Sequence, residues 1–247
     1  MLAPWLGGKA RIAGRLIPMF PPHRCYVEVF GGMASVLLNK PSVDSEIYND
    51  RDERLVGLFA VLKYHGAEFD REMRGLLKSR RIFELFREQP GLTDIQRAAR
   101  FLYCHLVGFG GMGRTFGTGK GSGGAQLRSL ESAHAMIERI RTRLATVTVE
   151  HLDWEACLEK YDSPDTFFFL DPPYDQTAGY AVPFSERDQQ VLAERLRMIR
   201  GKFLQTNSDN PRTRSWYRGF KVSTLRSAYG LRTSSCSAFV HLVVKNY

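Results

Sequence analysis

The chain of 247 residues is 43% hydrophobic and 12% aromatic, which excludes a disordered polymer and fits one domain with room for an insertion. No stretch approaches the roughly 20 apolar residues of a membrane span, and the first 18 residues lack the apolar run of an export signal, so we expect a cytoplasmic protein. The net charge is +9, and residues 54–143 carry 16 Lys and Arg against 8 Asp and Glu, a concentration that favours a polyanionic partner.

The opening of the chain, residues 1–52, has the pattern of a nucleotide-binding α/β sheet. An apolar strand over 26–30 ends at a glycine pair, a helix is predicted over 33–38, and a second strand over 46–50 has an acidic end. Strand, glycine turn, helix and strand in this order indicate a sheet with helices on its faces.

The segment 53–145 interrupts this alternation with a run of predicted helices. Apolar side chains recur there at helical spacing, and a glycine-rich stretch at 108–124 precedes the last helix. Because this segment also carries the excess of basic residues, we interpret it as an insertion into the sheet. The predicted helical stretches are 55–62, 82–86, 98–106 and 130–144.

Residues 146–247 resume the sheet pattern. A strand over 147–149 precedes the continuous apolar run 166–171, as expected for a central strand buried on both faces. That strand must end at Pro172 and Pro173, because a proline cannot donate to a sheet ladder. The remaining predicted elements are a helix over 185–199 with a Ser-x-x-Asp capping pattern and strands over 203–207, 220–223 and 238–244.

The cysteines show no pattern of a metal site. They lie far apart and form no C-x-x-C pair, so we expect reduced thiols and no bound metal. The four are Cys25, Cys104, Cys157 and Cys236.

The tetrapeptide at the end of the central strand, Asp171, Pro172, Pro173 and Tyr174, has the clearest chemical meaning. An exocyclic amine on a base is a poor nucleophile, because its lone pair is delocalised into the ring. The Asp171 carboxylate and the Pro172 carbonyl can each accept one amine hydrogen, which aims the lone pair at a methyl donor, while Tyr174 stacks on the base. The carboxyl end of a strand is a ligand-binding position in open α/β sheets. The tetrapeptide therefore predicts amine methylation, with a proline-rich turn as the alternative.

Three loops are predicted to contact a cofactor. Gly31 and Gly32 let the backbone approach a ligand after the first strand, where Glu28 can bond its polar end. Asp50 ends the second strand, a position that binds ribose hydroxyls in dinucleotide folds or, equally, caps a helix. Residues 5–9 combine paired glycines with a lysine available for a carboxylate, and they are too short for a Walker loop.

In their order along the chain, these motifs resemble the Dam-type, alpha-class DNA adenine-N6 methyltransferases. The matching stretches are Trp5 with Gly7, Gly8 and Lys9, then residues 27–32, 49–50, 101–111, 171–174 and 205–209. The chain differs from the family pattern at Val29, which replaces a proline, and at Cys104 and His105, which replace a Leu-Asn pair. The second difference falls where DNA would be read, so the resemblance does not predict a target sequence.

The resemblance implies a Rossmann-like methyltransferase sheet built from residues 1–52 and 146–247, with 53–145 as an inserted helical, basic target-recognition region. It implies a monomer that flips an adenine out of double-stranded DNA, without a metal, and binds it at the tetrapeptide. Residues implied to bind S-adenosylmethionine are Trp5, Gly8, Lys9, Glu28, Phe30, Gly31, Gly32, Asp50, Asp153 and Asp171. Residues expected to contact DNA are Arg114, Lys120, Phe109 and Tyr180.

Three other functions stay open at this point. A cytosine-N4 methyltransferase shares the amine chemistry, but its tetrapeptide often begins with serine and its motif order usually differs. RNA and protein-glutamine methyltransferases tend to have asparagine at the first position and need no basic insertion. A catalytically inactive DNA-binding module would not require the intact tetrapeptide from Asp171 to Tyr174.

Overall fold

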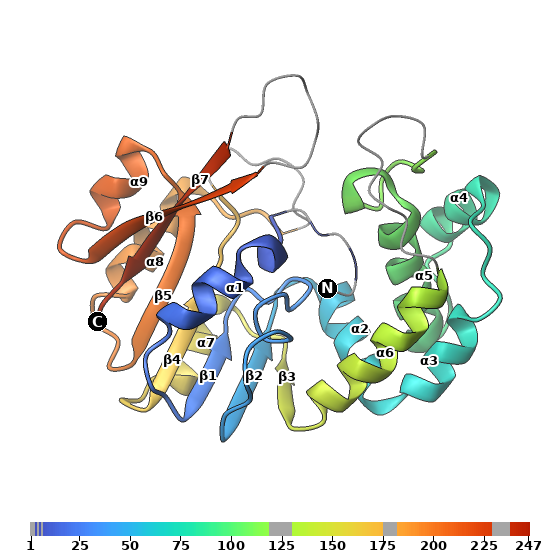
Figure 1. Cartoon of the computed structure of the whole chain (residues 1–247), viewed down its shortest axis with the longest axis horizontal. Helices are drawn as coiled ribbons and strands as arrows, with labels where there is room; N and C mark the ends of the chain where they lie inside the picture. The colour runs from blue at the N-terminus through green and yellow to red at the C-terminus, as the bar shows by residue number, and fades with distance from the viewer. Residues whose placement is uncertain (1–2, 4, 6, 119–129, 175–181, 229–237) are drawn as a thin grey trace.

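Figure 1 shows the chain as a computed structural model, which describes residues 3, 5, 7–118, 130–174, 182–228 and 238–247. Within these residues, seven strands form one sheet in the order β3-β2-β1-β4-β5-β7-β6. Strands β1 to β5 run parallel, whereas β7 lies antiparallel between β5 and β6. The strands are β1 (Cys25–Glu28), β2 (Ser45–Asn49), β3 (Val147–Glu150), β4 (Thr166–Leu170), β5 (Lys202–Ser208), β6 (Lys221–Ala228) and β7 (Ala238–Lys245).

The strand order reverses between β1 and β4, which lie side by side within the sheet. Val27 of β1 is in register with Ile47 of β2 on one side and with Phe168 of β4 on the other. All five residues of β4 are buried, which confirms the prediction of a central strand. Such a reversal opens a crevice at the carboxyl ends of the strands, where α/β proteins bind ligands.

The helices form two groups (Figure 1). Between β2 and β3, the chain forms a helical segment that lies beyond the β3 edge of the sheet. Its elements are α2 (Glu53–Tyr64), α3 (Gly66–Met73), α4 (Arg80–Glu88), α5 (Asp94–Val107), η3 (Phe109–Gly111) and α6 (Leu130–Leu144). The elements closer to the sheet are η1 (Lys9–Arg11), α1 (Ala13–Leu16), η2 (Ile17–Met19), α7 (Trp154–Tyr161), α8 (Glu186–Arg195) and α9 (Pro211–Trp216).

Local capping interactions determine where two of these helices begin. Ser185 and Asp188 exchange side-chain and backbone hydrogen bonds, which confirms the predicted capping box at the start of α8. Asp52 caps α2 by accepting a hydrogen bond from the Arg54 N–H. The helix cap after the second strand is therefore Asp52, and the alternative role of Asp50 as a cap is excluded.

The helix predicted over 33–38 is wrong, because the structure has consecutive turns there. Ala34 has a φ of 49°, in the left-handed region that a regular helix does not visit. The N–H of Leu37, which a helix would direct to a carbonyl four residues earlier, donates instead to the buried Glu28 carboxylate at 2.8 Å. A long-range hydrogen bond thus replaces the helical one.

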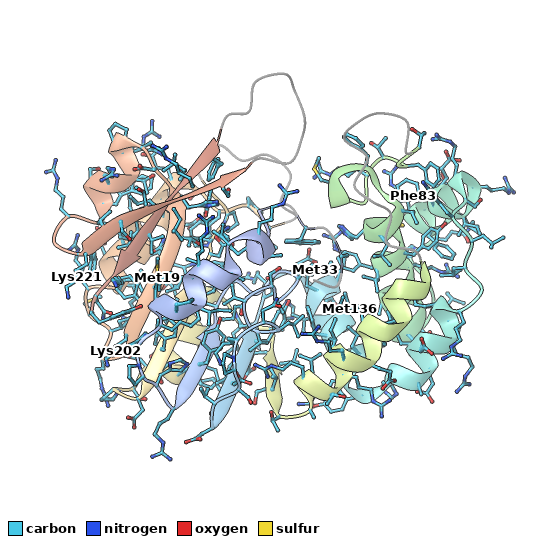
Figure 2. All side chains as sticks on the ribbon, viewed as in Figure 1. Met19, Met33, Phe83, Met136, Lys202 and Lys221 are labelled. Carbon is cyan, nitrogen blue, oxygen red and sulfur yellow. The ribbon has the colours of Figure 1, made fainter. Side chains whose placement is uncertain are left out.

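Two hydrophobic clusters cover opposite faces of the sheet. Because side chains alternate along a strand, Phe167 and Phe169 of β4 enter one cluster, and Phe168 and Leu170 enter the other. The first cluster continues without a break into α2, α3 and α5. In Figure 2, Met33 lies at this junction, at the centre of the molecule, and belongs to the same cluster. The helical segment therefore shares one core with the sheet.

Three of the cysteines are free thiols, and Cys236 lies outside the described residues. In the part of the chain that the structure describes, no three His, Cys, Asp or Glu side chains are grouped closely enough to hold a metal ion. Nor does any described helix have the length and apolar character needed to span a bilayer.

Candidate active site

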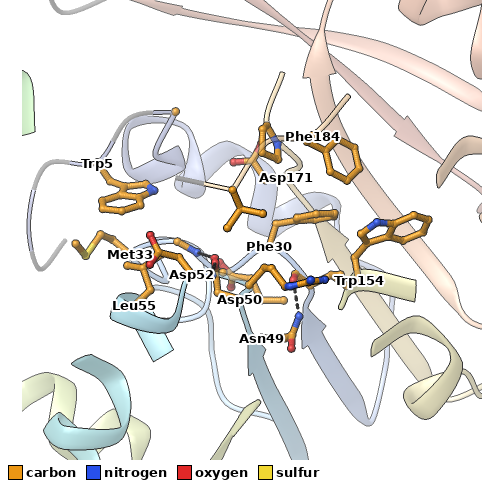
Figure 3. A pocket seen from close by; sticks show the side chains of 18 of the residues that line it. Trp5, Phe30, Met33, Asn49, Asp50, Asp52, Leu55, Trp154, Asp171 and Phe184 are labelled. Atoms are coloured by element: carbon orange, nitrogen blue, oxygen red, sulfur yellow. Dashed lines mark hydrogen bonds between the residues drawn. The ribbon is translucent and has the colours of Figure 1, made fainter. Parts of the chain in front are cut away.

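A cavity of about 390 Å³ opens at the carboxyl ends of β1, β2 and β4, where the strand order reverses (Figure 3). The residues that follow the end of each of these strands contribute to the lining of the cavity. All ten residues implied by the resemblance to bind a cofactor line this one cavity, although they come from five separate parts of the chain: Trp5, Gly8, Lys9, Glu28, Phe30, Gly31, Gly32, Asp50, Asp153 and Asp171.

The glycine turn after β1 forms one wall of the cavity. A Cβ atom on Gly31 would lie 2.2 Å from the Tyr48 ring, so only glycine fits there. Gly32 has a φ of 51°, and its N–H donates to the Asp50 carboxylate at 2.7 Å. The other Asp50 oxygen accepts from the Asp52 N–H at 2.8 Å. The ends of β1 and β2 are thus joined through Asp50.

Two carboxyl groups in this wall have raised pKa values. Burial raises the pKa of Glu28 to about 8, against the opposing effect of its hydrogen bonds from the Tyr26 hydroxyl and the Leu37 N–H. Burial also raises the pKa of Asp50 to about 6. Both groups lack a cationic partner among their hydrogen bonds, so a positively charged ligand in the cavity would favour their ionised forms.

The lining is acidic in a protein that is basic as a whole. The lining contains two basic side chains, Lys9 and Arg51, and six acidic ones. The acidic residues are Glu28, Asp50, Asp52, Asp153, Asp171 and Asp188. This charge balance suits a cationic ligand and disfavours a polyanion.

Three aromatic rings enclose one end of the cavity (Figure 3). The Phe184 ring lies edge-on to Phe30 at 5.4 Å and to Trp154 at 6.2 Å between centroids. The sequence analysis missed Trp154 and Phe184, and the structure places them next to the helix caps Asp153 and Ser185. Asp153 itself caps α7 and forms an ion pair with Arg51.

Asp171 lies directly after β4 and belongs to the same lining. Lys9 places its ammonium 2.6 Å from both Asp171 oxygens and also donates to the Gly7 carbonyl at 2.7 Å. The Thr206 hydroxyl, from β5, donates to Asp171 at 2.7 Å. Lys9 and Thr206 are both buried, so the carboxylate has one orientation and a permanent counter-ion.

The rest of the tetrapeptide is held by buried amides. The Gln189 side chain of α8 donates to the Pro173 carbonyl at 2.7 Å and accepts from Asn207 of β5 at 3.0 Å. No described residue donates to the Pro172 carbonyl. Tyr174 lies next to the cavity, with the Lys9 ammonium 4.7 Å from its ring centroid. The sequence analysis assigned no role to Gln189.

Residues 5–230, which contain the whole of this site, match the family of D12 class N6 adenine-specific DNA methyltransferases. The chain belongs to this family. A search of curated proteins found no match. The family assignment confirms DNA adenine-N6 methylation as the activity, and it confirms a Rossmann-like methyltransferase as the fold class. A methyl-donor cofactor follows from the reaction.

The methyltransferase has a second cavity, of about 580 Å³, within the helical segment. It shares Trp5 with the first cavity, and Arg114 is among its lining residues, as are the rings of Phe86 and Phe101. Five arginines and two carboxylates line it: Arg54, Arg87, Arg97, Arg100, Arg114, Glu53 and Asp94. The linings of these two cavities therefore have opposite charge.

Of the other predicted DNA contacts, Phe109 alone is among the described residues. Phe109 is half exposed and does not line the second cavity, and Lys120 and Tyr180 lie outside the described residues. His105, one of the departures from the family pattern, bonds the Gly111 carbonyl at 2.6 Å and packs against Trp5. It thereby joins the loop after α5 to the wall between the cavities.

Proposed function

We propose that this methyltransferase binds S-adenosylmethionine in the acidic cavity and transfers its methyl group to an adenine flipped out of double-stranded DNA. The observation that carries the proposal is the acidic, partly aromatic cavity at the strand reversal, whose lining includes the Asp171 carboxylate. The enzyme would act as a monomer, with residues 1–52 and 146–247 as catalytic core and 53–145 as target-recognition region.

The cavity fits the chemical groups of this cofactor. A sulfonium and an ammonium make the ligand cationic, which matches the surplus of carboxylates. Asp50 keeps acceptor capacity for ribose hydroxyls, and the rings of Phe30, Trp154 and Phe184 suit the flat adenine. The Ser35 hydroxyl, which lines the cavity, is buried without a hydrogen-bond partner among the described residues, so a polar ligand group would satisfy it. S-adenosylmethionine supplies an electrophilic methyl group.

Asp171 and Pro172 would hold the target amine by its two hydrogens. A carboxylate has about four acceptor positions, and Lys9 and Thr206 leave room at Asp171 for one more donor. In the transfer, the amine nitrogen would bond to the methyl carbon as the bond from that carbon to the donor sulfur breaks, and the nitrogen would afterwards release one proton to water. Lys9 stabilises Asp171 as an acceptor, so the site acts by orientation and electrostatics and needs no strong base.

The DNA would lie against the helical segment. Flipping a base costs a few kcal/mol of unstacking, which phosphate contacts offset. The arginines of the second cavity, Arg114 among them, would bind phosphates next to the flipped nucleotide. Trp5, which the two cavities share, would then stand between the cofactor and the DNA.

The test is transfer of tritium from labelled S-adenosylmethionine to unmethylated genomic DNA, followed by nucleoside analysis. We expect label in N6-methyladenine with the natural chain and with Asp44→Ala, an exposed control, but not with Asp171→Ala. Label in N4-methylcytosine would contradict the base assignment. Full activity of Asp171→Ala would contradict the proposed site, and failure of the natural chain to bind S-adenosylmethionine would contradict the cofactor.

A further inference from the structure

The aromatic ring of the tetrapeptide is anchored by the antiparallel end of the sheet. The Tyr174 hydroxyl lies 3.0 Å from Nδ1 of His241 on β7. The Tyr174 ring is nearly parallel to the ring of Phe239, two residues earlier on β7, at 17° and 5.9 Å between centroids. Because residues two apart on a strand point to the same face, β7 presents both contacts to Tyr174 together.

His241 is itself held on its other side. Its Nε2 lies 2.9 Å from the hydroxyl of Ser227 on β6, a strand that pairs with β7 over its whole length. The histidine is buried between β5, where Ser208 is its register partner, and β6, where Leu225 is. Both ring nitrogens therefore have hydroxyl partners, and a turn of the ring would break both contacts.

The electrostatic surroundings keep this imidazole neutral. Burial, together with the smaller effects of the positive charges of Lys9 and Arg15, lowers the pKa of His241 to about 4. A neutral ring offers one donor and one acceptor, which two hydroxyl groups can satisfy completely. The histidine is thus suited to fixing a hydroxyl, and it does not supply a proton near neutral pH.

Stacking on a base does not require the hydroxyl of a tyrosine, since a phenyl ring has the same face. A hydroxyl anchored at the far end of the ring, however, determines where that face points. A misplacement of 1 Å in such a site can cost about a hundredfold in rate.

We propose that His241 is a positioning residue, which together with Ser227 and Phe239 fixes the Tyr174 ring in the orientation that stacks on the target adenine. The inference rests on the proposed function of the tetrapeptide. It extends the active site from the parallel strands, which hold Asp171, to β6 and β7, which hold Tyr174. The cofactor cavity is lined by none of these four residues, so the effect on catalysis would be separate from cofactor affinity.

A double-mutant cycle tests this coupling. On saturating genomic DNA, we expect His241→Ala to lower kcat by roughly tenfold or more while the Kd for S-adenosylmethionine stays within about twofold. His241→Asn, which retains a hydrogen-bonding group close to Nδ1, would restore most of the rate. In a Tyr174→Phe background, His241→Ala would have almost no further effect, because the hydroxyl it acts through is gone.

Two results would overturn the inference: multiplicative losses from His241→Ala and Tyr174→Phe in the double variant, or equal losses in His241→Ala and His241→Asn. If His241→Ala does not fold by thermal unfolding, Ser227→Ala replaces it in the same cycle, with a smaller expected loss. The nucleoside formed by the natural chain is read in parallel. A product other than N6-methyladenine would contradict the proposed function, whereas the cycle reports only on the coupling between His241 and Tyr174.

Discussion

The acidic cavity at the strand reversal and the second cavity in the helical segment differ in charge, although Trp5 lines both. The cavity at the strand reversal is lined by six carboxylates and two basic residues, and the cavity in the helical segment by five arginines and two carboxylates. Under the proposed function, a basic polypeptide can hold a cationic cofactor close to a polyanionic substrate, because each ligand would meet a local field of opposite sign. The net charge of the whole chain, +9, agrees with the basic lining of the second cavity but does not indicate the acidic lining of the first.

The largest expected effect tests whether the acidic cavity contains the reaction centre. Asp171→Asn keeps the shape of the side chain but removes the charge that pairs with Lys9. We expect kcat to fall by about 10²- to 10³-fold, a range typical of losing one electrostatic contact in an active site. Tritium transfer to DNA measures it, with Asp44→Asn as the exposed control. A change in the Kd for DNA without a loss of kcat would mean that Asp171 contributes to DNA binding and not to the reaction centre.

The next largest effect separates the two ligands. Asp50→Ala removes the carboxylate that we propose for the ribose hydroxyls, and hydrogen bonds to a charged group contribute about 1.5–3 kcal/mol each. The Kd for S-adenosylmethionine should rise by about 10- to 100-fold, as measured by calorimetry, while the Kd for DNA changes less than about twofold. An equal rise in the Kd values for both ligands would mean that the two ligands do not bind independently.

The matching change on the basic side is Arg87→Gln with Arg100→Gln. We expect the Kd for DNA to rise by about tenfold, and the slope of log Kd against log salt to fall by about one for each arginine that contacts a phosphate. Fluorescence anisotropy at several salt concentrations measures both quantities. Arg74→Gln is the control, because Arg74 is exposed and lies outside the cavity. An unchanged slope in the double variant would exclude the second cavity as a phosphate site.

The smallest effect concerns stability, and it has a defined sign. Burial raises the pKa of Glu28 from 4.5 to about 8, so the folded state favours the protonated carboxyl. The contribution of this group to the free energy of unfolding is therefore full below pH 4.5, and it is lost as the pH rises to about 8. The Glu28→Gln variant cannot ionise at this position and so avoids the loss of stability. We expect its Tm to exceed that of the natural chain by a few degrees at pH 8, but hardly at pH 5. Thermal unfolding without cofactor measures it.

Glu46 is the matched control for that experiment, because it is buried but paired. Burial would raise its pKa, but hydrogen bonds from Arg143 and Lys40 lower it overall. Its ionised form therefore stabilises the fold above the unfolded pKa, and Glu46→Gln should lower Tm at pH 8. If both variants shift Tm in the same direction, the absence of a counter-ion at Glu28 does not explain the change in Tm of Glu28→Gln.

Much of the fold was predictable because its signals are local. The strands, the helix at 130–144 and the capping box at Ser185 follow from periodicity and from residues within a few positions of one another. The helix predicted over 33–38 failed because the Glu28 carboxylate, nine residues from Leu37, takes the N–H that a helix needs. Trp154 and Phe184 were missed because a buried aromatic residue looks the same in a core and beside a ligand.

The sequence by itself indicated the family, the order of the motifs and ten of the residues that line the cavity, because short-range patterns and strand ends locate the loops of a parallel sheet. Only the tertiary structure decided how those residues are used. The Lys9–Asp171 ion pair joins residues 162 positions apart, and the contact of Tyr174 with His241 crosses 67. Such pairings depend on which strands become neighbours in the sheet, and no local pattern encodes that choice.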